Sequence, residues 1–282
     1  MKIIKYLSLV LVVAISVSCE KNEIAYNTTP IGAVAEFQLH YFAPVNVAAA
    51  NNINRVLIDG QLYANRLAPL NTYNAIPSGS VGKFFTIAPG TVNLKMYTGA
   101  TDTTLVRIYN QNVTLTVGKQ NVFVHDTLKP PVVFNNGFPY TTRITAGTDS
   151  TCWVKFYNFL YDSARVPTIL KLQYQYVDPR NAAVLINIGQ PVLFGETTGW
   201  QPVKVVKEIF NSTGYDLAMP FKIKVIDSGG AVVGDLQIRS SSGTYGSYAE
   251  TKDVYIGRRY HHIVSRVKTI NANTAVRAFT AL

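Results

Sequence analysis

The sequence predicts an all-β protein that contains two tandem antiparallel β-sandwich domains. Segments rich in β-branched and aromatic residues recur along almost the whole chain, and no segment keeps the 3.6-residue period of an amphipathic helix. The 282 residues include 17 Tyr and 13 Phe, and 48% are hydrophobic while 15% are charged, so the chain can build packed cores. This length exceeds one average domain and favours two.

The first element is an export signal. Lys2 and Lys5 precede an apolar run from Leu7 to Val17, and Cys19 follows shortly afterwards. This order is typical of a lipoprotein signal peptide, here residues 1–18, whose removal leaves an N-terminal cysteine that carries lipid. Cys19 is therefore the predicted lipidation site, and lipid would hold the protein at the outer membrane.

Two other interpretations of this segment remain open. An ordinary cleaved signal would leave Cys19 as a free thiol, and Ser16 stands where lipoprotein signals usually carry leucine. A membrane-anchoring helix is the less favoured interpretation, because a helix that spans the bilayer core needs roughly 20 apolar residues and this run is shorter. Residues 19–32 are polar and mixed, which indicates an extended tether.

Residues 33–133 are predicted to form the first sandwich. Asp59-Gly60 lies between two apolar runs and Pro89-Gly90 between two others, so both are expected to be hairpin turns of an antiparallel sheet. The expected strands are Val34–Phe42, Arg55–Tyr63, Lys83–Ala88, Thr91–Tyr97, Leu105–Val117 and Asn121–Leu128.

A linker over residues 134–149 separates this sandwich from a second, over residues 150–282. Its expected strands are Cys152–Leu160, Thr168–Val177, Ala182–Ile188, Phe221–Ile226, Val232–Ile238 and Asp253–Val267. Lys and Arg alternate with apolar residues here, which places them on solvated strand faces and argues against a nucleic-acid partner. Cys152 begins a strand, where a buried small hydrophobe is expected.

The two halves also resemble each other. The segment 117–124 matches 256–263 as a strand, a glycine turn with basic residues, and a further strand. The segment 91–97 matches 220–226 in the same way. Two divergent copies of one sandwich explain these matches, although alternating strands also resemble one another by chance.

The first half further resembles a family of uncharacterised tandem immunoglobulin-like β-sandwich lipoproteins of Bacteroidetes. The resemblance is clearest over residues 35–128. It rests on Phe37–Phe42, the Val56–Gly60 hairpin, the Ala88–Thr91 turn and the final segment Leu115–Lys119. It implies a fold and a location at the cell envelope, facing the periplasm or the cell surface. It implies no functional residues.

Exported proteins of this kind are O-glycosylated at Ser or Thr after Asp, before a small aliphatic residue or Thr. Four segments match, which makes the candidate glycosylation sites Thr103, Thr127, Ser150 and Ser163. For each site the alternative is a turn-capping aspartate beside a β-prone residue.

The sequence predicts no metal site and no cofactor. His261 and His262 are adjacent, and neighbouring strand residues point to opposite faces, so the two cannot readily share a metal. His40 and His125 are isolated in the sequence. No catalytic motif is visible, so a hydrolase is the least favoured class.

We therefore expect a non-catalytic envelope protein for display, binding or scaffolding, held at the membrane through its lipid and engaging a polysaccharide or another envelope protein. Trp200, Tyr245 and Tyr248 lie on apparent insertion loops and are the candidate ligand contacts, with anchoring against the core as the alternative. The second hypothesis is a fimbrial or adhesin-type subunit that assembles by strand exchange through the leading segment Ile31–Phe42.

Overall fold

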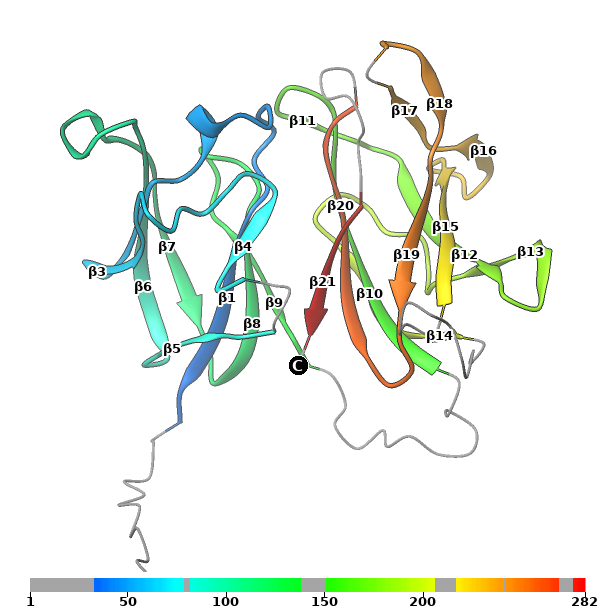
Figure 1. The fold of residues 1–282 in the computed structure, drawn as a ribbon, viewed down its shortest axis with the longest axis horizontal. Coiled ribbons are helices and arrows are strands. Elements are labelled where there is room, and N and C mark those ends of the chain that lie inside the picture. Colours follow the sequence, from blue (N-terminus) through cyan, green and yellow to red (C-terminus); the bar gives the residue numbers. More distant parts are fainter. Residues whose placement is uncertain are drawn as a thin grey trace, which may run out of the picture. The chain divides into compact units, whose positions relative to one another are not determined.

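The structure is a computed structural model that describes residues 33–78, 82–137, 151–205, 217–240, 242–268 and 276–281 (Figure 1). Every regular element longer than three residues within these ranges is a β-strand, which confirms the all-β prediction. The predicted signal, the tether and Cys19 lie outside the described ranges. No helix in the described ranges has the length and apolar character needed to cross a bilayer.

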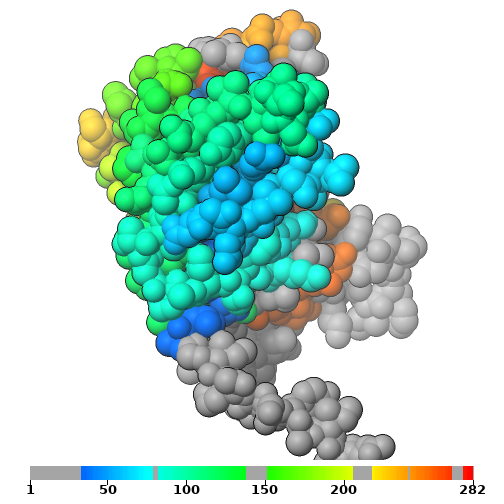
Figure 2. Space-filling model, turned by 90° about the vertical axis from the view of Figure 1, so that its left-hand side faces the viewer, coloured from blue at the N-terminus to red at the C-terminus, as the bar shows by residue number. Residues whose placement is uncertain are grey.

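The first half of the chain forms two stacked sheets. One sheet has the order β4-β1-β8-β9, with β5 also paired to β1, and the other has the order β3-β2-β6-β7. The strands are β1 (Ala35–Tyr41), β2 (Arg55–Ile58), β3 (Gln61–Ala64), β4 (Asn74–Ile76), β5 (Phe85–Ile87), β6 (Gly90–Thr98), β7 (Val106–Leu115), β8 (Gly118–Val124) and β9 (Val132–Asn135). The sheet of β2, β3, β6 and β7 faces the viewer in Figure 2.

The second half forms two larger sheets and a small hairpin of β17 and β18. One sheet has the order β11-β10-β20-β21 with β14 also on β10, and the other β13-β12-β15-β16 with β19 also on β15. The strands are β10 (Thr151–Ser163), β11 (Val166–Pro167), β12 (Lys171–Asp178), β13 (Asn181–Asn187), β14 (Thr197–Lys204), β15 (Leu217–Ile226), β16 (Val232–Asp235), β17 (Gln237–Arg239), β18 (Tyr245–Ser247), β19 (Ala249–Val254), β20 (Arg259–Val267) and β21 (Val276–Ala281).

The two halves share most of their topology. Strand β1 pairs with β5 and β8 as β10 pairs with β14 and β20. The short strands β4 and β11 also pair with β1 and β10, but they differ in chain order, because β4 follows β3 whereas β11 precedes β12. In the second sheets, β3-β2-β6-β7 corresponds to β13-β12-β15-β19, and β16 to β18 are an addition to the second half. The segments 117–124 and 256–263 thus build the equivalent strands β8 and β20, and 91–97 and 220–226 build β6 and β15, as the repeat hypothesis requires. We refer to the halves as the first and second copies.

The prediction of purely antiparallel sheets is wrong at two pairs. Strands β1 and β8 run parallel, and so do β10 and β20. In each copy the first strand and a late strand lie side by side, so the long chain between them supplies the crossover that a parallel pair needs. The sheets are therefore mixed.

The two predicted hairpins have different outcomes. Asp59-Gly60 joins β2 to β3 with both residues at positive φ, 48° and 83°, as a two-residue hairpin requires. Pro89-Gly90 is not a hairpin turn, because β5 pairs with β1 while β6 pairs with β2 and β7. The chain crosses there from one sheet to the other.

Each copy has its own apolar core between its two sheets. The first core centres on Phe37, Leu94 and Tyr109, and the second on Phe156, Tyr174 and Phe221. Cys152 is fully buried in the second core and forms no disulfide, as the sequence predicts. The domain boundaries at 33–133 and 150–282 remain predictions.

A third buried cluster joins the two copies, which both lie within the compact unit Ala33–Leu282. We call it the aromatic interface, and its buried members are Phe42, Tyr73, Ala75, Phe123, Tyr157, Phe159, Ile263 and Phe279. Phe123 stacks on Phe159 with ring centroids 4.9 Å apart and also contacts Tyr157 at 5.2 Å. The outer faces of two equivalent sheets therefore pack against each other.

The contacts in this interface are reciprocal. The Gly118 N–H donates to the Val34 carbonyl and the Gly257 N–H to the Thr151 carbonyl, so residues of β1 correspond to those of β10 at a constant offset. By this offset and the strand registers, His40, Phe42 and Phe134 correspond to Tyr157, Phe159 and Phe279.

Matching ring pairs occur in both directions across the interface. His40 contacts Phe279 at 5.4 Å and Phe134 contacts Tyr157 at 5.1 Å. Likewise, the Phe42–Phe279 centroid distance is 6.3 Å and the Phe134–Phe159 distance is 6.4 Å. This is the pattern of an isologous dimer interface, built here within one chain.

Candidate functional site

The structure corrects one of the three candidate aromatic contacts. Tyr248 is only 2% exposed, packs in the second core, and its hydroxyl donates to Glu250, so it is not on the surface. Trp200 lies on β14 rather than in an insertion loop, and its indole N–H donates to the Asn136 carbonyl at 2.6 Å. Of the three, Tyr245 alone is largely exposed, at 55%.

The candidate modification sites fall in different environments. Thr103 is exposed in a short 3-10 turn, Ser163 is exposed at the end of β10, and Thr127 is half-buried in a turn. Ser150 lies outside the described residues, as does Cys19. Their modification remains a prediction.

All four histidines are buried and serve packing. His261 contacts the Tyr157 hydroxyl at 2.9 Å in the aromatic interface, whereas His262 contacts the Tyr174 hydroxyl at 2.9 Å in the second core. The adjacent pair therefore points to opposite faces, as its spacing predicts. Among the described residues no group of three His, Cys, Asp or Glu side chains could hold a metal ion.

Burial also lowers the pKa of two groups at the aromatic interface. It lowers the pKa of His40 to about 4, although the hydrogen bond to Asn121 acts in the opposite direction. It lowers the pKa of Lys155 to about 8, and the ammonium donates to the Asn135 carbonyl at 2.8 Å. The histidine is thus neutral near pH 7, and its ring packs as an aromatic group.

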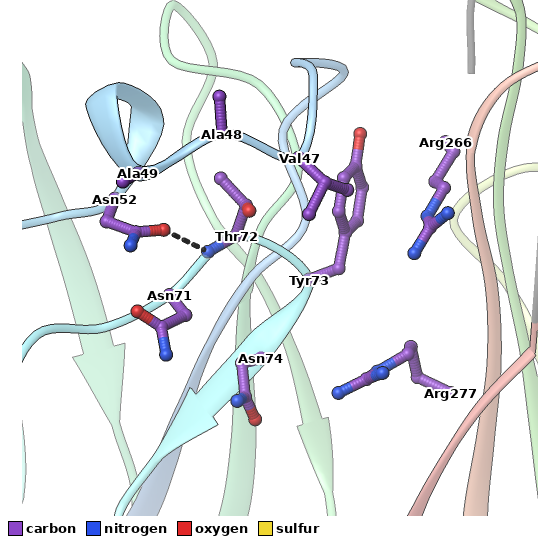
Figure 3. A pocket seen from close by; sticks show the side chains of 10 residues that line it. All are labelled: Val47, Ala48, Ala49, Asn52, Asn71, Thr72, Tyr73, Asn74, Arg266 and Arg277. Carbon is purple, nitrogen blue, oxygen red and sulfur yellow. Dashed lines mark hydrogen bonds between the residues drawn. The ribbon is translucent and has the colours of Figure 1, made fainter. Parts of the chain in front are cut away.

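A cleft at the edge of the interface is the candidate functional site (Figure 3). We call it the arginine cleft, and it has a volume of about 360 Å³. It is lined by Val47, Ala48, Ala49, Asn52, Asn71, Thr72, Tyr73, Asn74, Arg266 and Arg277. The first eight residues belong to the first copy and the two arginines to the second.

The two guanidinium groups give the cleft a positive charge. Arg266 lies near the end of β20 and Arg277 near the start of β21, and Figure 3 shows both side chains directed toward Tyr73 and Asn74. None of the described lining residues is a carboxylate, although Glu250, outside the lining, is close enough to Arg266 to stabilise its charge. Burial lowers the pKa of Arg266, but an arginine keeps its charge in proteins.

The backbone is strained where the two copies meet in this cleft. Four described residues other than glycine have positive φ, and two of them, Asp59 and Arg165, occupy hairpin turns. The other two are Tyr73, with φ of 55°, and Arg266, with φ of 87°. For a bulky residue this conformation costs on the order of 1–3 kcal/mol and is found mostly where function requires it.

Tyr73 and Arg266 also contact each other. The Arg266 guanidinium carbon lies 5.1 Å from the centroid of the Tyr73 ring, within cation–π range. The Tyr73 ring is 1% exposed, and its hydroxyl donates to the Val45 carbonyl at 2.6 Å. The ring therefore acts as a fixed support that holds the guanidinium in the cleft.

The amide groups of the cleft present donors as well. The Asn52 Oδ1 accepts from the Thr72 N–H at 3.1 Å, and the Asn74 Oδ1 accepts from the Ala75 N–H at 2.9 Å. Both oxygens are thus occupied, and neither Nδ2 group has a hydrogen-bond partner among the residues that the structure describes, so both can donate to a ligand. The arginine cleft thus combines two cations with neutral N–H donors, which suits an anionic ligand rich in oxygen acceptors.

The arginine cleft has no signature in the sequence. Tyr73 and Arg266 belong to different copies and meet only through the packing of the aromatic interface. A single sequence offers no local signal for that encounter. The surplus of basic residues in the second half was the nearest hint.

No protein-family model matches the chain, and no curated protein matches it. A candidate cell adhesion protein from Bacteroides fragilis is 9% identical with a TM-score of 0.26, over 88% of this chain and 98% of that one. A candidate adhesin from Bacteroides ovatus is 10% identical with a TM-score of 0.21, over 87% and 95%.

The TIE protein of Bacillus anthracis is 7% identical with a TM-score of 0.19, and it covers 83% of this chain and 34% of that one. Such identities and TM-scores establish neither a shared family nor a shared function.

Proposed function

We propose that this protein is a non-catalytic binding protein of the bacterial cell envelope, anchored by lipid at Cys19, and that the arginine cleft binds an acidic saccharide. The observation that carries the proposal is the pair of strained, mutually contacting residues Tyr73 and Arg266 in a cleft lined by a second arginine. Strain of this kind persists when the surrounding structure enforces it, and it is concentrated at ligand sites.

The donor arrangement favours an acidic sugar over a bare anion. Two guanidinium groups match a carboxylate, and the free amide nitrogens of Asn52 and Asn74 match hydroxyl oxygens beside it. A uronic acid combines both groups in one small molecule. The cleft volume of about 360 Å³ lies within the range of small-ligand sites.

The same lining supports binding without catalysis. General acid–base chemistry needs a side chain that exchanges protons near neutral pH, such as His, Asp or Glu. None of the ten described lining residues is of these types. Tyr73 carries a hydroxyl, but burial raises its pKa far above neutral pH.

Calorimetric titration with single uronic acids tests the binding proposal. We expect the protein to bind galacturonic or glucuronic acid and to bind galactose and glucose much more weakly. Arg277→Gln should weaken uronate binding roughly 10-fold or more, because a hydrogen bond to a charged group contributes about 1.5–3 kcal/mol.

Arg180→Gln is the matched control, since Arg180 is exposed in the turn between β12 and β13 and does not line the cleft. Equal loss in both variants would mean that only net charge matters. Failure of the unaltered protein to bind either uronate would overturn the proposal.

The anchor is tested separately, by growing cells with an alkyne-tagged fatty acid. We expect label on the protein and none on Cys19→Ser. Protease treatment of intact cells then separates display at the cell surface from a periplasmic position. An unmodified Cys19 in the mature protein would leave a secreted protein without an anchor.

Strand exchange through the leading segment 31–42 receives no support. Strand β1 pairs over its whole length with β8 on one side and with β4 and β5 on the other. Its hydrogen-bonding edges are occupied within its own chain. An assembling subunit would need another edge.

A further inference from the structure

A second groove lies beside the arginine cleft and shares a wall with it. It has a volume of about 590 Å³, and Ala49 and Asn52 line both hollows. Ala49 is the first residue of the 3-10 turn Ala49–Asn51, and Asn52 follows this turn directly. We call this hollow the Arg66 groove, after the one cation among its described lining residues.

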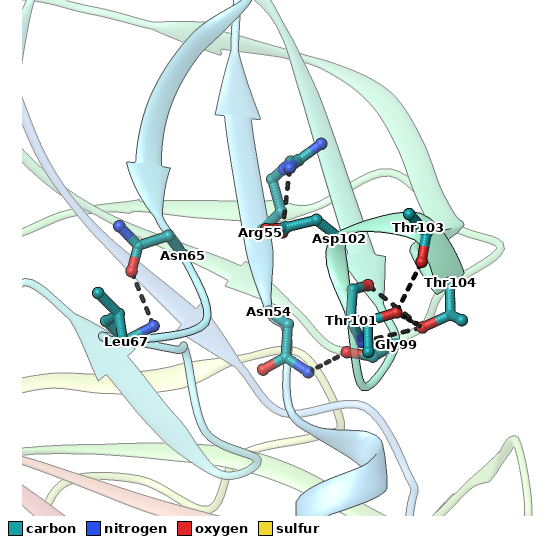
Figure 4. Close-up of polar contacts among 9 residues, drawn as sticks. All are labelled: Asn54, Arg55, Asn65, Leu67, Gly99, Thr101, Asp102, Thr103 and Thr104. Atoms are coloured by element: carbon teal, nitrogen blue, oxygen red, sulfur yellow. Dashed lines mark hydrogen bonds and ion pairs between the residues drawn. The ribbon is translucent and has the colours of Figure 1, made fainter.

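The far wall of the Arg66 groove is fixed by local hydrogen bonds (Figure 4). The Asn54 Nδ2 donates to the Gly99 carbonyl at 2.8 Å, which ties the loop after β6 to the start of β2. The turn at Thr101–Thr104 is closed by a capping box in which both threonine side chains take part. The groove is therefore formed before any ligand arrives.

Arg66 leaves the Arg66 groove positively charged. The nearby Arg55 pairs with Asp102 at 3.4 Å, whereas Arg66 has no ion pair within the described part of the chain. The lining contains no carboxylate, and Asn54 and Thr104 add polar groups to it. Its charge and polarity thus repeat those of the arginine cleft, at a site built by the first copy alone.

We infer that the two hollows are subsites for one ligand, an acidic polysaccharide whose successive uronate units reach Arg277 and Arg266 in one hollow and Arg66 in the other. This inference rests on the proposed function, since it extends the same site. It specifies a polymer in place of a single sugar. When two linked groups bind neighbouring sites, the second binding step is intramolecular, and affinity rises by about 10²–10⁴.

The test is a length series of galacturonate oligomers, from the monomer to the hexamer, titrated into the full chain and its variants. For the unaltered protein we expect affinity to increase at least 10-fold once the oligomer spans both hollows. Arg66→Gln should reduce hexamer affinity to near the monomer value. Arg277→Gln should weaken both, and Arg180→Gln should change neither.

Each outcome separates the two proposals. If the monomer binds but affinity does not rise with length, or if Arg66→Gln leaves hexamer binding intact, the polymer inference fails and the proposed function stands. If neither monomer nor hexamer binds, both fail. Polyglutamate is the control for charge alone, and equal binding of polyglutamate and oligogalacturonate would refute saccharide recognition.

Discussion

Replacing Phe123 by alanine tests the packing of the two copies directly. Phe123 is fully buried and its ring meets those of His40, Tyr157 and Phe159, so it touches both copies. Removing a buried phenylalanine side chain costs about 3–5 kcal/mol. For a domain of 150–250 residues each kcal/mol shifts Tm by about 2–4 °C, so we expect a fall on the order of 6–20 °C.

Urea unfolding and scanning calorimetry measure this effect, and a double-mutant cycle makes it specific. Phe123→Ala and Phe159→Ala remove the two sides of one stacked pair, whose centroids are 4.9 Å apart. Their coupling energy should be about 0.5–1.5 kcal/mol. Phe221→Ala is the control partner, because Phe221 lies in the second core and should not couple to Phe123. A coupling of zero between Phe123 and Phe159 would refute the interface.

Acid should destabilise the protein through its buried histidines. The pKa of His40 is about 4 in the folded protein and 6.5 in the unfolded chain, so the unfolded state binds the proton first. The free energy of unfolding should therefore fall by about 3 kcal/mol for this group as the pH drops from 6.5 to 4. Urea midpoints at pH 7, 5.5 and 4 measure the loss, and a flat profile contradicts it. Gly99→Ala should lower Tm, because Gly99 has φ of 141° and an added Cβ would lie 2.9 Å from the Leu105 Cα. An unchanged Tm would show that the loop adjusts freely. The Cys152 thiol is fully buried, so a thiol reagent should react with it only after urea unfolding, and fast reaction in buffer would place it elsewhere.

Local patterns predicted most of the individual strands. Alternation and β-branched residues located β1, β6 and β15, and Asp59-Gly60 specified its own hairpin because both positions need positive φ. The similarity of 117–124 to 256–263 located the equivalent strands β8 and β20. These features depend on neighbours in the sequence, which a single chain displays.

The features that depend on distant contacts were missed. The parallel pairing of β1 with β8 joins strands that are far apart in the chain, so no turn sequence between them predicts it. Strand β14 pairs with β10, but its glycine, proline and polar residues are more typical of a loop, so the sequence predicts an insertion there. Tyr248 follows a Ser- and Gly-rich stretch typical of an exposed loop, yet its ring reaches the second core.

The candidate site belongs to the same class of long-range features. Arg266 lies on a strand that the sequence predicts, but its neighbour Tyr73 precedes β4, which sequence reasoning did not find. The cleft forms where loops of one copy meet strand ends of the other. Its chemistry therefore becomes visible only after the copies are packed.

The reciprocal aromatic interface has a consequence for the chain as a polymer. The contacts of Phe42, Phe123 and Phe159 hold the copies together independently of the peptide bonds between Gly137 and Thr151. A molecule cleaved once in that stretch should therefore migrate as one particle and keep its ligand. An isolated copy, in contrast, would expose the aromatic surface that the other copy normally covers. It should therefore associate with the other copy or with a second molecule of the same copy.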